Sequence, residues 1–379
     1  MAIQEAIPES VEWNGKKTPI YPMETVSFER LLSQEPAELD KVVRCCETEG
    51  FFYLDLQGID GRRMLEDQQK TLELMHRFFE SPLEVKNQYG LISPHLGYEP
   101  VGSRTGVFKD TKDGYEMIKV GGHFRLPRCT KRLSHTELIG YQQVARDEIQ
   151  KSSPHVPSVI KNSPDLKILE NAIAGCNIIT KTILSSLSSG LGLTGAARFE
   201  NTHRNDRPST TTLAMMHYIP SDPVAQKIGH QKHTDISSLT LLFSEQWGLQ
   251  IRPPGAREFG FVKPKDGCAI VNVGDSLRFA SGHKMQSCIH RVVPFDPTEH
   301  RYSIAYFLRA EDSTMFTDSE GRYITAGQWH DEKFFAFTNP PELLADVPAS
   351  MILGGMKEEE DKDVTASAPS VSKEITVET

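Results

Sequence analysis

The sequence contains no apolar run of the roughly 18 residues that a membrane-spanning helix needs. Its opening stretch, MAIQEAIPES, also lacks the basic and apolar regions of a signal peptide. Lys and Arg form no basic stripe of the kind that binds nucleic acid. These absences predict a cytoplasmic protein with neither a membrane nor a nucleic-acid partner.

Cysteine chemistry is also poorly represented. The six cysteines include no C-x-x-C pair, and the adjacent Cys45 and Cys46 do not suit a disulfide framework. Reduced thiols are the rule in the cytosol. We therefore predict free cysteines and no cysteine-based metal site.

What is present is the composition of a soluble globular protein that can bury a core. Hydrophobic residues make up 38% of the 379 residues and charged residues 25%. The formal net charge is −9, but the segment from Lys357 to Thr379 has three Lys and seven Asp or Glu, hence −4. Residues 351–379 are therefore expected to be a disordered acidic tail.

Helical spacing of apolar residues dominates the first half of the chain. Residues 33–50, 62–82 and 163–190 each carry an apolar stripe with a break at the end. A further helical segment around residues 106–124 is a candidate lid. We predict a mainly helical amino-terminal region over residues 1–160.

Residues 161–350 are expected to contain the last of these helices and a β-rich core. Short β-branched and apolar runs alternate there with Gly, Pro, Asp and Asn. The runs are 213–219, 238–243, 248–253, 259–264, 268–274, 287–295 and 301–309. Such a series is typical of a jelly roll, so the fold class is α+β with helices around a jelly-roll core.

Three H-x-[DE] triplets are present, beginning at His135, His233 and His330. Only His233 enters an extended β run, GHQKHTDISSLTLLF, where side chains two residues apart point to the same side. His233 and Asp235 therefore face one spot. They are either two ligands of one metal ion or a hydrogen-bonded pair at a loop edge.

A second histidine in a similar setting favours the metal. His290 lies in the β-branched run SCIHRVV, and a jelly roll can bring two such strands side by side. Two His and one carboxylate with open coordination positions suit a non-haem Fe(II) oxygenase. The alternative for His290 alone is a histidine buried in the core.

A candidate carboxylate-binding pair follows in the next strand. Arg301 and Ser303 share one strand face by the same alternation. The planar guanidinium can grip a carboxylate with two hydrogen bonds, and the hydroxyl can add a third. The alternative is an Arg exposed on the surface, which the apolar SIAYFL that follows makes less favourable.

Together these residues resemble the iron- and 2-oxoglutarate-dependent oxygenases of the isopenicillin N synthase-like class. The matching segments are His233-Thr234-Asp235, LTLL, GLQI, VNVGD, SCIHRVV and RYSIAYF, in that class's order and near its spacing. ELDKVVRCCETEGFFYL and LGYEP near the amino terminus also match. The resemblance covers roughly residues 17–340.

The resemblance implies a double-stranded β-helix that holds Fe(II) with His233, Asp235 and His290. Arg301 and Ser303 would bind the distal carboxylate of 2-oxoglutarate. Tyr218 matches the Tyr of an Asn-x-Tyr segment that helps to hold this cosubstrate, although Met216 replaces the Asn.

The implied reaction uses O2 and releases succinate and CO2. It hydroxylates, desaturates or closes a ring in a small metabolite, in the setting of natural-product biosynthesis. The oligomeric state and the substrate's identity are not predicted.

Two alternatives remain at this point. An oxidase of the same fold would use no 2-oxoglutarate, and Arg301 and Ser303 would then grip the substrate's own carboxylate. A non-catalytic β-sandwich would instead hold a structural metal, with Cys288 as a fourth ligand two residues before His290. A buried thiol is the favoured reading of Cys288, and His230 is expected to face away from the metal.

Overall fold

The computed structural model describes residues 9–90, 97–104, 112–121, 164–220, 229–338 and 349–356. The helices are α1 (Phe28–Leu32), α2 (Pro36–Thr48), α3 (Ile59–Phe79), α4 (Leu83–Asn87), α7 (Asp165–Gly190), α8 (Asp275–Ala280) and α9 (Ala326–Thr338), with 3-10 turns at Gly195–Ala197, Phe199–Thr202 and Ala349–Leu353. The strands are β1 (Ser10–Trp13), β2 (Lys16–Pro19), β3 (Thr25–Ser27), β4 (Phe51–Asp55), β5 (Gly97–Glu99), β6 (Tyr115–Gly121), β7 (Thr212–Tyr218), β8 (His230–His233), β9 (Leu239–Phe243), β10 (Leu249–Arg252), β11 (Gly260–Phe261), β12 (Cys268–Val273), β13 (Ile289–Val292), β14 (Arg301–Leu308), β15 (Met315–Thr317) and β16 (Tyr323–Thr325).

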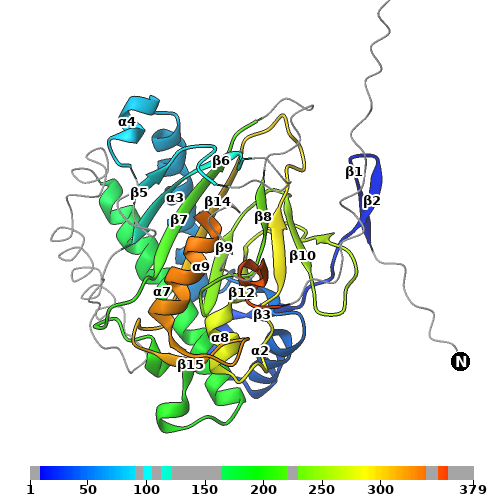
Figure 1. The fold of residues 1–379 in the computed structure, drawn as a ribbon, viewed down its shortest axis with the longest axis vertical. Helices are drawn as coiled ribbons and strands as arrows, with labels where there is room; N and C mark the ends of the chain where they lie inside the picture. Colours follow the sequence, from blue (N-terminus) through cyan, green and yellow to red (C-terminus); the bar gives the residue numbers. More distant parts are fainter. Residues whose placement is uncertain are drawn as a thin grey trace, which may run out of the picture.

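Two facing sheets form the core of the molecule (Figure 1). The larger sheet has the strand order β3-β4-β12-β9-β14-β7-β6-β5, and the smaller has the order β11-β10-β13-β8. Side chains of both sheets pack in one shared interior, among them Met117 and Ala305 from the larger sheet and Leu249 and Val292 from the smaller. The predicted α+β fold with a jelly-roll core is confirmed.

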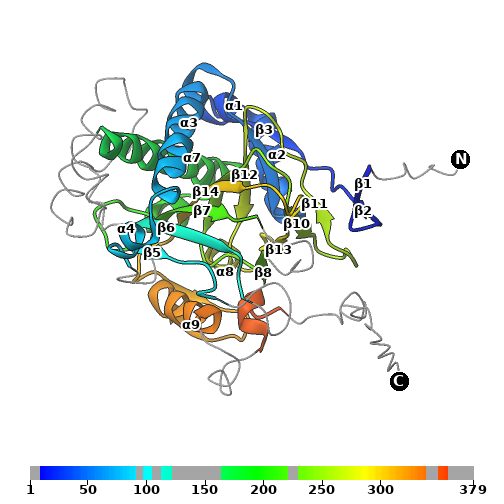
Figure 2. The ribbon, with the colours of Figure 1, turned by 90° about the horizontal axis from the view of Figure 1, so that it is seen from above.

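Helices cover the outer face of the larger sheet. Figure 2 shows α3 and α7 on one side of this sheet, with α9 and the smaller sheet on the other. Leu169, Ile173 and Ile183 of α7 are buried together with the outward-facing Ile304 and Tyr306 of β14. The apolar stripe of α7 therefore fixes the sheet from behind and leaves its other face for the site. No described helix is long and apolar enough to cross a membrane.

The three helices expected from apolar spacing are present as α2, α3 and α7, and each expected strand run contains a strand. The expected helix around residues 106–124 is wrong for its described part, because Tyr115–Gly121 is the strand β6. Its alternation was obscured by buried charges: Lys119 faces the interior with Tyr115 and Met117, whereas Ile118 and Val120 face the helices. A charged residue at an inward position removes the period-2 signal.

The larger sheet contains strands from both predicted regions, residues 1–160 and residues 161–350. Two strands of the amino-terminal region pair with strands of the core, β4 with β12 and β6 with β7, and β3 and β5 extend the sheet by pairing with β4 and β6. The assignment of two regions therefore remains a prediction about sequence organisation.

The start of the disordered tail was predicted too early, at residue 351. Residues 351–356 are described and packed: Thr234 N–H donates to Ile352 O at 3.1 Å, and Met351 and Leu353 are buried. The backbone hydrogen bond places this segment directly on the strand end that carries His233. Residues 357–379 lie outside the described part of the chain.

Lys333 anchors α9 to the loop that follows β8. Its side chain is 0% exposed and donates to Thr234 Oγ1 at 2.6 Å and to the Asp275 carboxylate. Burial lowers the pKa of Lys333, and the Asp275 charge opposes this effect. A buried pair is costly to break because the remaining charge has no partner.

We expect Lys333→Met to lower the free energy of unfolding by about 3–5 kcal/mol. Urea denaturation measures the change. The matched control is Lys284→Met at an exposed position, expected to stay within about 0.5 kcal/mol of the parent protein. A Lys333 variant as stable as this control would contradict the anchoring role.

Candidate active site

His233, Asp235 and His290 converge between the two sheets. β13 pairs with β8 so that His290 lies opposite His233, and Asp235 follows two residues after β8 ends. Asp235 Oδ1 lies 3.4 Å from His233 Nε2 and 3.6 Å from His290 Nε2. One ligand atom from each residue lies within 4.8 Å of the others, a geometry that could hold one metal ion.

The tautomers of both histidines suit a metal. His233 Nδ1 lies 2.7 Å from Gln231 O, and His290 Nδ1 lies 3.1 Å from Cys288 O. Because a carbonyl oxygen can only accept, each Nδ1 carries the hydrogen and each Nε2 keeps its lone pair. Two nitrogen lone pairs and a carboxylate oxygen facing one point repel one another unless a cation lies between them.

The carboxylate of Asp235 is held by residues far away in sequence. Thr240 Oγ1 and Asn272 Nδ2 donate to its Oδ2 at 2.6 and 2.7 Å, which leaves Oδ1 directed at the histidines. Hydrogen bonds of this kind orient metal ligands. Sequence inspection missed both residues, because neither lies in the triplet motif.

Electrostatics keep these groups in the forms that bind metal. Burial alone would raise the pKa of Asp235, but positive charge or a donated proton at the adjacent His290 and His233 lowers it well below its usual range, and a bound cation would act in the same direction. Burial and the nearby His290 lower the pKa of His233. The carboxylate is therefore charged and the His233 imidazole neutral at neutral pH.

Arg301, Ser303 and Tyr218 meet at one end of the larger sheet. Tyr218 lies opposite Arg301 in the β7–β14 register, with the guanidinium 4.8 Å from the centre of its ring. Arg301 donates from Nε to Trp247 O and from Nη2 to Ser244 Oγ, both at 3.0 Å. Arg301 Nη1 and Ser303 Oγ are buried without a hydrogen-bond partner among the described residues. A small carboxylate would satisfy both.

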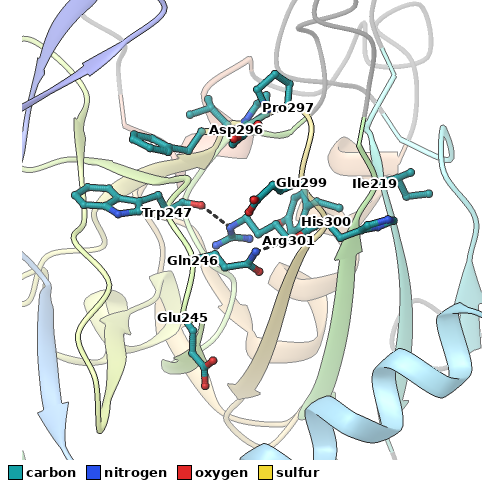
Figure 3. A pocket seen from close by; sticks show the side chains of 13 residues that line it. Ile219, Glu245, Gln246, Trp247, Asp296, Pro297, Glu299, His300 and Arg301 are labelled. Atoms are coloured by element: carbon teal, nitrogen blue, oxygen red, sulfur yellow. Dashed lines mark hydrogen bonds between the residues drawn. The ribbon is translucent and has the colours of Figure 1, made fainter.

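Two cavities lie near this end of the sheet. The first, of about 220 Å³, is lined by Arg301 and Tyr218, and Figure 3 shows the Trp247 carbonyl that accepts from Arg301. The second, of about 330 Å³, is lined in part by Ser303 and Ser244. Neither is lined by the three converging residues.

His230 does not face away as expected from strand alternation. Its ring centre lies 4.3 Å from that of His233, and a register irregularity separates the pairs His290–His233 and Val292–His230. Such a bulge places residues three apart on the same side. His230 Nε2 is buried without a hydrogen-bond partner among the described residues.

The remaining candidates lie elsewhere. Cys288 is a buried thiol that donates to Arg252 O at 3.3 Å, and it is not part of the converging group. Five described cysteines are free thiols, as expected, and Cys129 lies outside the described residues. His330 lies in α9 beside Asp331, and His135 is also outside the described residues.

Comparisons with known proteins agree with this geometry. A family model for the 2OG-Fe(II) oxygenase superfamily matches residues 211–310, and one for the amino-terminal region of the non-haem dioxygenases in morphine synthesis matches residues 23–135. A 2-oxoglutarate-dependent dioxygenase of Gibberella zeae is 35% identical over 89% of this chain and 93% of its own. One from Amanita muscaria is 46% identical over 53% of this chain and 98% of its own.

Solved structures share the fold. A full-length protein of Neurospora crassa, in complex with alpha-KG and thymine, superposes with a TM-score of 0.63 at 20% identity, covering 86% of this chain and 98% of its own. A rice dioxygenase for auxin oxidation gives a TM-score of 0.60 at 21% identity, covering 86% and 99%. The chain therefore belongs to the 2OG-Fe(II) oxygenase superfamily and is a non-haem dioxygenase that uses Fe(II), 2-oxoglutarate and O2.

Proposed function

We propose that His233, Asp235 and His290 bind the catalytic Fe(II). The observation that carries this proposal is the convergence of two Nε2 lone pairs and one carboxylate oxygen on a single buried point. Two His and one carboxylate leave further coordination positions open for a cosubstrate and O2. A structural zinc site would instead be closed by a fourth protein ligand, and the Cys288 thiol is directed at Arg252 O.

Arg301, Ser303 and Tyr218 are proposed to bind the distal carboxylate of 2-oxoglutarate. The unpartnered Arg301 Nη1 and Ser303 Oγ support this assignment, as does the burial of the guanidinium. The hydrogen bonds from Arg301 to Trp247 and Ser244 would fix the guanidinium before the cosubstrate arrives. Tyr218 would contribute its ring, whose hydroxyl now lies 3.9 Å from Met216 Sδ.

In this scheme the protein positions the iron, the cosubstrate and the substrate, and these bound groups carry out the reaction. Fe(II), 2-oxoglutarate and O2 would supply the oxidising chemistry, with release of succinate and CO2. Thr240 and Asn272 keep Asp235 Oδ1 aimed at the metal, and the buried surroundings exclude water. Arg301 sets the direction from which the cosubstrate reaches the iron.

The substrate is a small-molecule metabolite, and we propose natural-product biosynthesis as its setting. Similar structures are described with such ligands: thymine in the Neurospora crassa protein, and JA in JOX2 together with 2OG and Fe. We further propose that hydroxylation, desaturation or ring formation is the outcome. We also propose a cytoplasmic location, where reduced thiols such as the five described ones are the rule, and no nucleic-acid or membrane partner.

An anaerobic titration of metal-free protein with Fe(II) and then 2-oxoglutarate tests the function. We expect a visible charge-transfer band that needs both additions. Binding of iron without any such band at saturating 2-oxoglutarate would contradict the proposed site. Oxygen uptake with candidate substrates but no 2-oxoglutarate would then become the next measurement.

We expect Asn272→Ala to weaken Fe(II) binding about 10-fold to 100-fold. Without its hydrogen bond, the Asp235 carboxylate can rotate away from the histidines. Fe(II) titration of the metal-free protein measures the affinity. Asn205→Ala is the matched control, because this amide contacts Asn177 instead. Equal iron affinity in the two variants would remove Asn272 from the support of the metal.

A further inference from the structure

The inner face of β14 carries an arginine at each end. Arg301 begins the strand, and Arg309 follows its last residue. Between them, Phe307 lies opposite Thr240, the residue whose hydroxyl donates to Asp235. Eight residues of extended chain span about 26 Å. The two arginines therefore lie on opposite sides of the candidate metal site, and 2-oxoglutarate would occupy only the Arg301 side.

Arg309 is directed into the space between the sheets. Its guanidinium lies 5.3 Å from the ring centre of Phe307, and Nη1 donates to Thr210 O and, at 3.2 Å, to the buried Thr212 Oγ1. Arg309 Nε is buried without an acceptor, and no ion pair to Arg309 exists within the described part of the chain. Burial lowers the pKa of Arg309 to about 10, and only the Asp235 charge opposes this.

The neighbouring carboxylates do not neutralise the charge of Arg309, because each is paired with another residue. Glu99 accepts from Arg104 Nε and Nη2, both at 2.8 Å, and from Lys119 at 2.6 Å, while Asp113 accepts from Arg104 N at 3.2 Å. Burial lowers the pKa of Lys119 to about 7; the Arg104 and Arg309 charges act in the same direction, and the Glu99 carboxylate opposes them. Adding an anion beside Lys119 and Arg309 would relieve this repulsion.

α9 contacts Lys119 and Arg104 as well as the candidate metal site. Phe334 lies over Lys119 and Arg104, with 5.1 and 5.3 Å from each cation to the ring centre. Phe337, three residues later, packs edge-on to His233 with ring centres 5.3 Å apart. Three residues of helix rise by about 4.5 Å. A substrate anchored beside the cations would therefore extend toward the iron along α9.

We propose that the substrate carries a carboxylate, which binds to Arg309 with help from Lys119 and holds a C–H bond of the molecule near the metal. This inference rests on the proposed iron site, since bound Fe(II) would also offset the Asp235 charge that now stabilises Arg309. A carboxylate would give Arg309 Nε its missing acceptor through a charge-assisted hydrogen bond. The carbonyl oxygen of a neutral amide could also accept from Arg309 Nε, but it would leave the positive charge of the guanidinium without a counterion and form the weaker bond.

The test uses the full chain loaded anaerobically with Fe(II) and saturating 2-oxoglutarate, so that Arg301 is occupied. Benzoate and benzamide, and hexanoate and hexanamide, are titrated while the charge-transfer band is followed. We expect each acid to shift the band with a dissociation constant at least tenfold lower than that of its amide. In Arg309→Gln the preference should fall to about one, whereas Arg309→Lys should keep part of it. Arg257→Gln, at an exposed position, is the matched control.

The outcomes separate this inference from the proposed function. Equal binding of acids and amides, or a preference that survives in Arg309→Gln, would overturn it. So would loss of the band on adding an acid, which would show displacement of 2-oxoglutarate, and so would no response to any acid. In all these cases the band formed beforehand still supports the iron and cosubstrate site. If Arg309→Gln forms no band at all, the preference for acids over amides is compared between Arg309→Lys and the parent. A smaller preference in the variant supports the inference, and an equal preference overturns it.

Discussion

His233→Ala is expected to lose Fe(II) binding and, with it, all 2-oxoglutarate-dependent oxygen consumption. Removing a group that only orients a ligand already costs about 10-fold to 100-fold in metal affinity, so removing a ligand should cost more than about 100-fold. The two remaining groups, Asp235 and His290, would form an incomplete site. Fe(II) titration of the metal-free variant, with oxygen uptake in parallel, measures both effects.

His300→Ala provides the control, because this histidine is exposed and contacts His217 rather than the converging group. Its iron affinity should equal that of the parent. Stoichiometric, tight Fe(II) binding by His233→Ala would show that the metal lies elsewhere. That result would also remove the basis for assigning Asp235 and His290.

Arg301→Gln is expected to raise the dissociation constant for 2-oxoglutarate at least about 100-fold. Hydrogen bonds to charged groups contribute about 1.5–3 kcal/mol each, and a bidentate pair would lose about 3 kcal/mol or more. Arg301 is only 7% exposed, so little screening by water reduces this effect. The charge-transfer band of the Fe(II)-loaded variant, titrated with 2-oxoglutarate, measures the constant.

Arg301→Lys separates charge from geometry at this position. Lysine keeps the positive charge but cannot offer two parallel donors, so an intermediate affinity is expected. Iron affinity should stay near that of the parent in both variants, since Arg301 does not contact the metal group. An unchanged 2-oxoglutarate affinity in Arg301→Gln would assign the distal carboxylate to other residues.

Local patterns in the sequence predicted the elements well. The apolar stripe of residues 163–190 became α7, and the run around His290 became β13. These patterns depend on which face of one helix or strand is buried, a property of neighbouring residues. The pairing of His290 with His233 also requires that β8 and β13 lie side by side in one register, which no pattern within either run specifies.

The bulge beside His230 marks the limit of this reasoning. Alternation placed His230 on the far side, whereas an irregular register brings its ring against His233. An inserted residue depends on how two strands pair, and no local pattern in HQKH reports it. The strand β6 was missed for a related reason, since Lys119 is an inward-facing residue whose charge is paired with Glu99.

By itself, the sequence determined the class of the fold, the chemistry of the donor groups, and the candidate ligands and carboxylate-binding pair, because each depends on residue type and short-range spacing. Only the tertiary structure decided which distant groups complete the site. Thr240 and Asn272 reach Asp235, Lys333 ties α9 to Thr234, and Arg309 faces the interior without a counterion in the described structure. Such contacts join strands and helices that are far apart in the chain, so packing and strand register create them.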